Sequence, residues 1–142
     1  MATAGIVWTR TVSVKTGAGT LGGVSQQITS DMEQNLSIDV AASAADQEVL
    51  FGWTRSRLQA IAADFKKNDD NSAVSPGNIT VKTNSTSSPG DTVVIPYGSA
   101  FNWFTGDVMT KPFNSADITK LFISNAAAVV VWFKLSILLT DK

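Results

Sequence analysis

The amino-acid sequence predicts an all-β protein, an antiparallel β-sandwich of eight or nine strands. Three observations lead to this fold class: apolar and polar residues alternate in many short segments, turn-forming residues separate those segments, and no repeat or long linker divides the chain. Alternation with a period of two gives each strand one dry face and one wet face, as in two sheets packed face to face. A jelly roll is one arrangement of such sheets.

The composition fits one domain spanning residues 1–142, with residues 1–5 as an N-terminal arm of small side chains. A chain of this length buries roughly 68–70% of its unfolded surface and needs no disulfide or metal to be stable. Apolar residues make up 44% of the chain and charged residues 16%, against about 25% charged residues in a typical soluble domain. A surface this poor in charge is common in subunits that pack against others.

Charge and hydropathy exclude several classes of partner. The net charge is −1 and no run of like charges exceeds two residues, so the basic patch of a nucleic-acid-binding protein is missing. The longest apolar stretch, Ala126–Leu139, is interrupted by Lys134 and Ser136 and is too short to span a bilayer. The chain has no cysteine, and its start lacks the basic and apolar regions of a signal peptide, so we expect it to fold inside the cell that makes it.

The N-terminal part of the chain contains three segments with strand alternation. Ile6–Val14 is the first, and Arg10 interrupts its apolar positions. Gly17–Gly23 follows as a flexible turn, because glycine tolerates positive φ. Leu36–Val40 and Val49–Trp53 are the next two segments, each with apolar residues at every second position.

The C-terminal part contains five further segments of the same kind. Turn-forming clusters separate them, of which Asn84–Asp91 is the clearest, and Pro96 ends one strand. Together with the three earlier segments they give eight strands, and Leu58–Lys66 adds a ninth if it is extended. The predicted strands are Ile79–Thr83, Thr92–Ile95, Ala100–Phe104, Ile118–Ile123 and Val129–Leu139.

The segment Leu58–Lys66 fits either a strand or a helix. Leu58, Ile61, Ala62 and Phe65 follow the i, i+3, i+4, i+7 spacing of one helix face, and several residues of the segment are good helix formers. Strands of about 5–8 residues at regular spacing on both sides favour a strand, because tertiary context overrides intrinsic propensity. We expect a strand, and a helix over Leu58–Phe65 stays the alternative.

The last predicted strand has apolar residues on both faces. Val130, Trp132 and Leu138 lie opposite the main apolar stripe, so this strand is either central and covered or buried against a neighbouring subunit. Residues that share one parity within their strands are expected to be mostly buried. These residues are Leu36, Ile38, Val40, Trp53, Trp103, Val131, Phe133, Leu135 and Ile137.

The sequence argues against an enzyme. The chain has neither histidine nor cysteine, which removes Ser-His and Cys-His nucleophile pairs and the common zinc sites. A carboxylate pair is the remaining catalytic option, and the spacing of the acidic residues singles out none. Asn68–Asn71 lacks the central glycine and the late glutamate of a calcium loop. We expect no catalytic residue, no cofactor and no tightly bound metal.

Aromatic residues are dense between Tyr97 and Phe113. Phe101 and Trp103 alternate within a predicted strand and are expected to fill the core. Aromatic and methionine side chains at the edges of turns are favoured where proteins meet, and in a lectin they would stack on sugar rings. With the outer tryptophan of the last strand added, the candidate interface residues are Tyr97, Phe104, Met109, Phe113 and Trp132.

From Gln47 onward, a characteristic order of segments is formed by the stretches Gln47–Trp53, Leu58–Phe65, Ile79–Ser85, Asp91–Ile95, Phe101–Trp103, Pro112–Phe113, Asp117–Leu121 and Ile123–Leu139. This order resembles that of small β-sandwich virion proteins encoded by tailed bacteriophages. The resemblance covers about two thirds of the chain and consists of strand rhythm more than fixed chemistry. The segment Lys66–Gly77 is longer than the corresponding hairpin of such proteins.

The resemblance implies a structural virion protein: a capsid decoration or cement protein that stabilises the phage head, or another minor virion component. Proteins of this kind are β-rich, are often trimeric and bridge subunits of the major capsid protein. We therefore expect a homo-oligomer that folds in the host cytoplasm, and a trimer is the preferred oligomeric state. On the head surface it binds the major capsid protein or another virion protein, without contact with nucleic acid or membrane. The alternative is a carbohydrate-binding β-sandwich module on a phage fibre or in a secreted complex.

Overall fold

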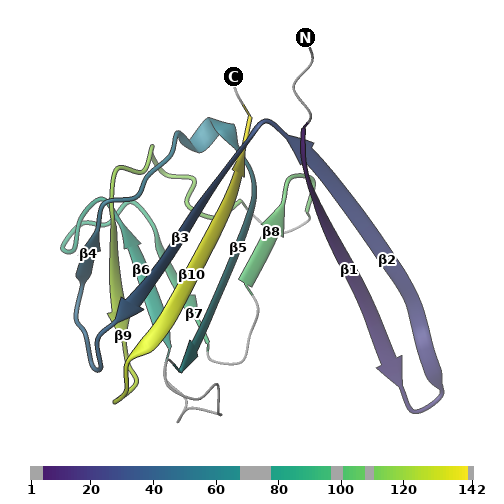
Figure 1. Ribbon diagram of the computed structural model, residues 1–142, viewed down its shortest axis with the longest axis horizontal. Helices are drawn as coiled ribbons and strands as arrows, with labels where there is room; N and C mark the ends of the chain where they lie inside the picture. The colour runs from purple at the N-terminus through teal and green to yellow at the C-terminus, as the bar shows by residue number, and fades with distance from the viewer. Residues whose placement is uncertain (1–4, 68–77, 97–100, 108–110, 141–142) are drawn as a thin grey trace.

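The computed structural model describes residues 5–67, 78–96, 101–107 and 111–140, and for residues 12–16, 19–24 and 66–67 it describes the backbone. Over these residues the chain forms two antiparallel four-stranded sheets and a separate two-stranded hairpin (Figure 1). The predicted all-β class and antiparallel sandwich are confirmed. The elements are β1 (Ile6–Thr16), β2 (Gly19–Ser30), β3 (Met32–Val40), β4 (Gln47–Val49), the 3-10 turn η1 (Arg55–Arg57), β5 (Leu58–Lys67), β6 (Ile79–Thr83), β7 (Thr92–Ile95), β8 (Phe101–Phe104), β9 (Leu121–Asn125) and β10 (Val131–Leu139).

The two four-stranded sheets form the layers of the sandwich. One has the strand order β3-β10-β5-β8 and the other the order β4-β9-β6-β7, and every neighbouring pair is antiparallel. Apolar side chains from both sheets meet in one buried core, in which Phe133 and Ile61 of the first sheet join Ile79 and Ile123 of the second. The core therefore lies between the sheets, as alternation in the sequence requires.

Strand β10 is central in its sheet, which explains the apolar residues on both of its faces. It pairs with β3 on one side and with β5 on the other, and its inward residues Phe133 and Ile137 are fully buried. On the outer face Leu138 is also fully buried, because residues of the hairpin pack over it. Trp132 on the same outer face is half-buried.

Strand β5 confirms the strand prediction for its segment and shows why the apolar spacing looks helical. The pairing register with β10 shifts at Gln59, which is an extra residue in β5. Such a bulge moves the alternation by one position. Leu58 and Ile61 therefore enter the same core although they are three residues apart, while Ala62 lies half-buried beside the open groove on the outer face.

The hairpin contains a strand that the sequence analysis missed. The segment Gly17–Gly23 was expected to be a flexible turn, and the structure places only Gly17 and Ala18 in the turn. From Gly19 the chain continues as β2 up to Ser30 and pairs with β1 along its whole length. The predicted arm of residues 1–5 lies outside the described residues, apart from Gly5.

Two predicted strands are shifted along the chain. Instead of Val49–Trp53 the strand is β4, and instead of Ile118–Ile123 it is β9. Trp53 and Ile118 form an isolated bridge between these regions, in which each backbone N–H donates to the other residue's carbonyl at 2.9 Å. Gly52 allows this close approach, because a Cβ there would lie 2.1 Å from the carbonyl oxygen of Ile118.

Most of the predicted core residues are buried, and the two exceptions lie on one edge strand. Leu36 and Ile38 of β3 are half-buried and pack against the core. Within the part of the chain that the structure describes, β3 pairs with β10 alone, so its inward side chains are covered from one side. The residues confirmed as buried are Val40, Trp53, Trp103, Val131, Phe133, Leu135 and Ile137.

Phe133→Ala tests the position of the core. Phe133 is fully buried at the centre of the sandwich, so the substitution is expected to lower the free energy of unfolding by about 3–5 kcal/mol. Denaturant unfolding measures the change. Leu50→Ala is the control, because Leu50 is 82% exposed and its loss should cost less than about 0.5 kcal/mol. Equal effects at both positions would contradict the assigned core.

Candidate functional site

The β1–β2 hairpin is the most distinctive feature of the molecule. Its register runs from Ile6 opposite Ser30 to Thr16 opposite Gly19, and neither strand belongs to one of the two four-stranded sheets. Asp31 alone separates β2 from β3. Figure 1 shows the hairpin diverging from the sandwich towards its tip, so it is an arm attached at one end.

The attachment is made by two complementary sets of side chains at the open end of the hairpin. One set comes from β1 and β2, and the other from the outer face of the β3-β10-β5-β8 sheet and the turn after β8. We call Ile6, Trp8, Arg10, Gln26 and Ile28 the hairpin base, and Ala60, Asn102, Phe104, Asp107 and Leu138 the docking face.

The centre of the attachment is apolar. Ala60, Phe104 and Leu138 of the docking face form a small buried cluster beneath Ile6, Trp8 and Ile28. The rings of Trp8 and Phe104 lie 6.3 Å apart between centroids, at 47°. Because burial of apolar surface contributes about 25 cal/mol per Å², this cluster supplies the non-directional part of the attachment.

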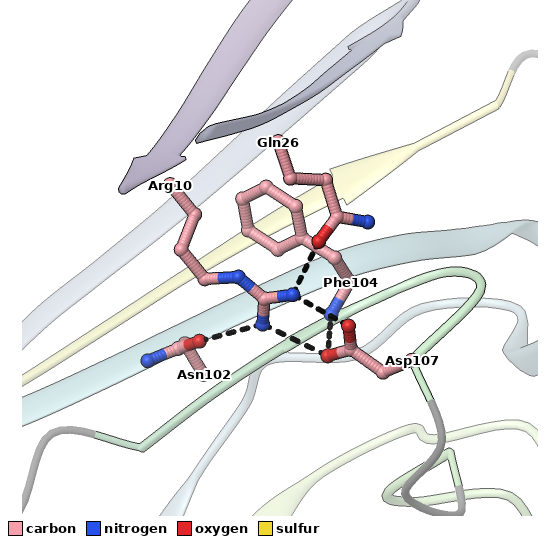
Figure 2. A network of polar contacts seen from close by, with 5 residues as sticks. All are labelled: Arg10, Gln26, Asn102, Phe104 and Asp107. Atoms are coloured by element: carbon pink, nitrogen blue, oxygen red, sulfur yellow. Dashed lines mark hydrogen bonds and ion pairs between the residues drawn. The ribbon is translucent and has the colours of Figure 1, made fainter. Parts of the chain in front are cut away.

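A polar network around Arg10 supplies the directional part (Figure 2). Arg10 Nη1 donates to Asp107 Oδ2 at 2.8 Å and to Asn102 Oδ1 at 2.9 Å, and Nη2 donates to Asp107 Oδ1 and Gln26 Oε1. The guanidinium carbon also lies 4.5 Å from the centre of the Phe104 ring. A two-pronged arginine–carboxylate pair stacked on an aromatic ring is geometrically specific, so the network determines where on the sheet the hairpin attaches.

The turn after β8 holds Asp107 ready for Arg10. Gly106 has a φ of +94°, a conformation that glycine adopts without steric cost. Asp107 N donates to the carbonyl of Phe104 at 3.0 Å, and Phe104 N donates to Asp107 Oδ2 at 2.9 Å. The carboxylate is therefore oriented by its own turn before the hairpin contributes a contact.

Both charges of the pair are stabilised in their ionised forms. The hydrogen bond to Asp107 raises the pKa of Arg10 above its ordinary value. The hydrogen bonds from Arg10 and from the backbone N–H of Phe104 lower the pKa of Asp107 below its ordinary value of 3.8, against the opposing effect of burial. Because the folded pKa of Asp107 is lowered, its stabilising contribution is complete above the ordinary value and is lost as the pH falls through the lowered one.

A further contact ties the hairpin to the edge of the sheet. Trp8 Nε1 donates to Glu33 Oε1 on β3 at 2.6 Å. Beside Trp8, an open groove of about 450 Å³ runs between β1 and the outer faces of β5 and β8, over Ala62 and Asn102. A second depression of about 310 Å³ continues it over Ser136 of β10. The outer sheet face is thus covered at the hairpin base and open next to it.

Two of the candidate interface residues are buried in the structure. Phe104 and Phe113 are 4% and 3% exposed, so neither ring lies open on the surface of the chain. Phe104 is covered by the chain's own hairpin, and Phe113 packs edge-on against Trp53 in the core at 5.7 Å. Neither ring is open to a sugar. Tyr97 and Met109 lie outside the described residues.

Trp132 is the candidate that the structure places on the surface. It is half-buried on the outer face of β10, and its Nε1 donates to Ser37 Oγ at 2.5 Å. Lys134 Nζ lies 4.1 Å from the centre of the ring. The indole therefore lies along the sheet under an ammonium group, and the structure does not bring it together with Phe104 or Phe113 in one patch.

Sequence reasoning missed the residues that attach the hairpin. Arg10 was noted only as an interruption of an apolar pattern, and Asp107 as one acidic residue among many. The signal available was a charged residue at an inward parity of the first strand, between Trp8 and Val12. Such a residue needs a partner of opposite charge, and only the fold shows that the partner lies 97 positions further along the chain.

The described residues include no group of three or more acidic side chains close enough to hold a metal ion. Within that same part of the chain, no helix is long and apolar enough to cross a membrane.

Comparisons with known proteins identify no family. No protein-family model and no curated protein matches the chain. A solved structure described as "Bacillus endospore appendages form a novel family of disulfide-linked pili" is similar over 78% of this chain and 88% of that chain, with 14% sequence identity and a TM-score of 0.35. A likeness this distant carries neither fold details nor function over to this chain.

Arg10→Ala is expected to loosen the hairpin without unfolding the sandwich. The substitution removes charge-assisted hydrogen bonds worth about 1.5–3 kcal/mol, so amides of β1 and β2 should exchange with deuterium at least about tenfold faster. Lys120→Ala is the control, because it removes an exposed pair with Glu48 on the other sheet. Unchanged exchange in the hairpin of the Arg10 variant would contradict the assigned role of the network.

Acid is expected to release the hairpin before the sandwich unfolds. As the pH falls through the lowered pKa of Asp107, the carboxylate is protonated and the pair with Arg10 is lost. Hydrogen exchange between pH 5 and pH 2, corrected for intrinsic rates, measures the opening. Asp107→Asn removes the titrating group and serves as the control. A wild-type pH profile identical to that of Asp107→Asn would show that another group controls release.

Proposed function

We propose that this chain is a structural subunit of a protein assembly and that the β1–β2 hairpin is the arm with which it engages a neighbouring subunit. The finer proposal is a capsid decoration or cement protein on the head of a tailed bacteriophage, bound to the major capsid protein. The observation that carries the general proposal is the hairpin itself, with strands of 11 and 12 residues that lie outside both sheets.

A projecting hairpin needs a partner for physical reasons. Two strands without a third strand or a covered face are marginally stable in water, and ordering their backbone costs about 1–2 kcal/mol per residue. The contacts at the hairpin base account for the attached end. A neighbouring subunit that covers the remainder would supply the missing stabilisation, so the arm is best explained as part of an assembly.

The rest of the molecule fits a structural role. The chain has no histidine or cysteine and few charges, and the groove beside the hairpin offers a contact surface over the small side chains of Ala62 and Ser136. The phage head as the site of assembly, the major capsid protein as the partner and a trimer as the oligomer rest on the resemblance of residues 47–142 to small virion proteins.

The test is co-sedimentation of the full chain with lattices of the major capsid protein encoded in the same genome. The proposal predicts saturable binding. A variant with a shortened arm joins Thr11 to Ser25, which are partners in the register, through an Asn-Gly turn and so keeps the hairpin base. It should bind at least tenfold more weakly at unchanged thermal stability.

Leu50→Ser is the matched control, since it changes an exposed residue far from the hairpin register. It should bind like the wild type. Wild-type protein that stays unbound at all lattice concentrations would reject the capsid proposal. Equal binding by the shortened-arm variant would reject the role of the hairpin in it.

A further inference from the structure

We propose that the hairpin is exchanged between copies of this chain, so that the hairpin base of one copy occupies the docking face of a second copy and Arg10 pairs with Asp107 across the interface. This inference rests on the proposed role as an assembly subunit and names the partner of the arm as a second copy. It is supported by the way the hairpin is attached, by the connection that holds it and by the complementarity of the two surfaces.

The hairpin is attached by side chains rather than by a shared sheet. Among the described residues, no strand of either four-stranded sheet pairs with β1 or β2. The attachment consists of the apolar cluster around Phe104, the network around Arg10 and the Trp8–Glu33 bond. Moving the hairpin to another copy therefore breaks no ladder of backbone hydrogen bonds, and every side-chain contact can be made again in the second copy.

The connection between the hairpin and the sandwich is a short hinge. Asp31 is the one residue between β2 and β3, and it forms a bend. Ser30 Oγ and Asp31 N both donate to the carbonyl of Leu139, at 2.7 and 3.3 Å. If the bend straightens, β2 and β3 become one continuous strand from Gly19 to Val40. Short hinges of this kind favour exchange of the element they connect.

Complementarity between the hairpin base and the docking face makes the second copy the matching partner. The cation of Arg10 fits the carboxylate that the turn after β8 orients, and Trp8 fits over Phe104. Any copy offers both halves of this match, so exchange conserves the contacts and adds new ones where the straightened strands of two copies run side by side. Each copy then donates one arm and receives one, which closes in a pair or in a ring such as a trimer.

Charge exchange between two variants tests the inference. Arg10→Asp places two carboxylates in the interface and Asp107→Arg places two guanidinium groups there, so each variant alone should lose association at micromolar concentration. Mixed during refolding, they restore opposite charges only across copies. Native mass spectrometry with one variant isotopically labelled should then detect species that contain both.

The double variant Arg10→Asp with Asp107→Arg in one chain is the control, because it restores the pair both within and between copies. It should associate with itself to within threefold of the wild type. Recovery in the double variant without mixed species from the single variants would place the contact within one chain and overturn the inference. A wild-type chain that sediments as a monomer at all concentrations would overturn it as well.

The length of the hinge gives a second test that does not alter the interface. Insertion of Gly-Gly-Ser after Asp31 lets the hairpin fold back freely on its own docking face, so it should raise the midpoint concentration of association at least tenfold. Association unchanged by the insertion would contradict exchange. Exchange of hairpins without binding to capsid lattices would support this inference and reject the phage proposal. A monomer that binds capsid lattices would support the phage proposal and reject this inference.

Discussion

The outer face of β10 sets the constraint on which the rest of the structure depends. As the central strand it buries Phe133 and its neighbours inward, and at its end Leu138 points outward and is nevertheless fully buried. A two-layer sandwich has no third layer to cover such a residue, so another part of the chain has to do so. The hairpin base fulfils this requirement through Ile6, Trp8 and Ile28, and the position of the arm follows from it.

The polar contacts then decide which orientation the arm adopts. Apolar burial alone is non-directional, and a flat hairpin could lie across a sheet at several angles. Arg10 removes this freedom, because its guanidinium engages both oxygens of Asp107 while it lies over the ring of Phe104. The same pair makes the attachment sensitive to acid. Arg10 and Asp107 also fit each other in the same way whether they belong to one chain or to two copies.

The sequence predicts the sandwich well and the arm poorly, for physical reasons. Alternation identifies a strand and its dry face, and it correctly predicted strands β6 and β7 and the buried face of β10. It does not say which strands pair, so Ile6–Val14 was expected within the sandwich. Glycines between Gly17 and Gly23 suggested a long turn, although glycine is also tolerated in a strand at a cost. The bulge at Gln59 imitates a helical stripe because it shifts parity inside one strand.

Hydrogen exchange of β1 and β2, measured across a range of protein concentrations, tests most directly whether the arm acts between copies. Within a lone chain the protection of these amides is independent of concentration. If the arm of one copy is held by another, protection rises as the protein is concentrated from nanomolar to micromolar, while amides of β6 and β9 in the core of the other sheet stay constant. Protection of the arm that does not change over this range would contradict the account.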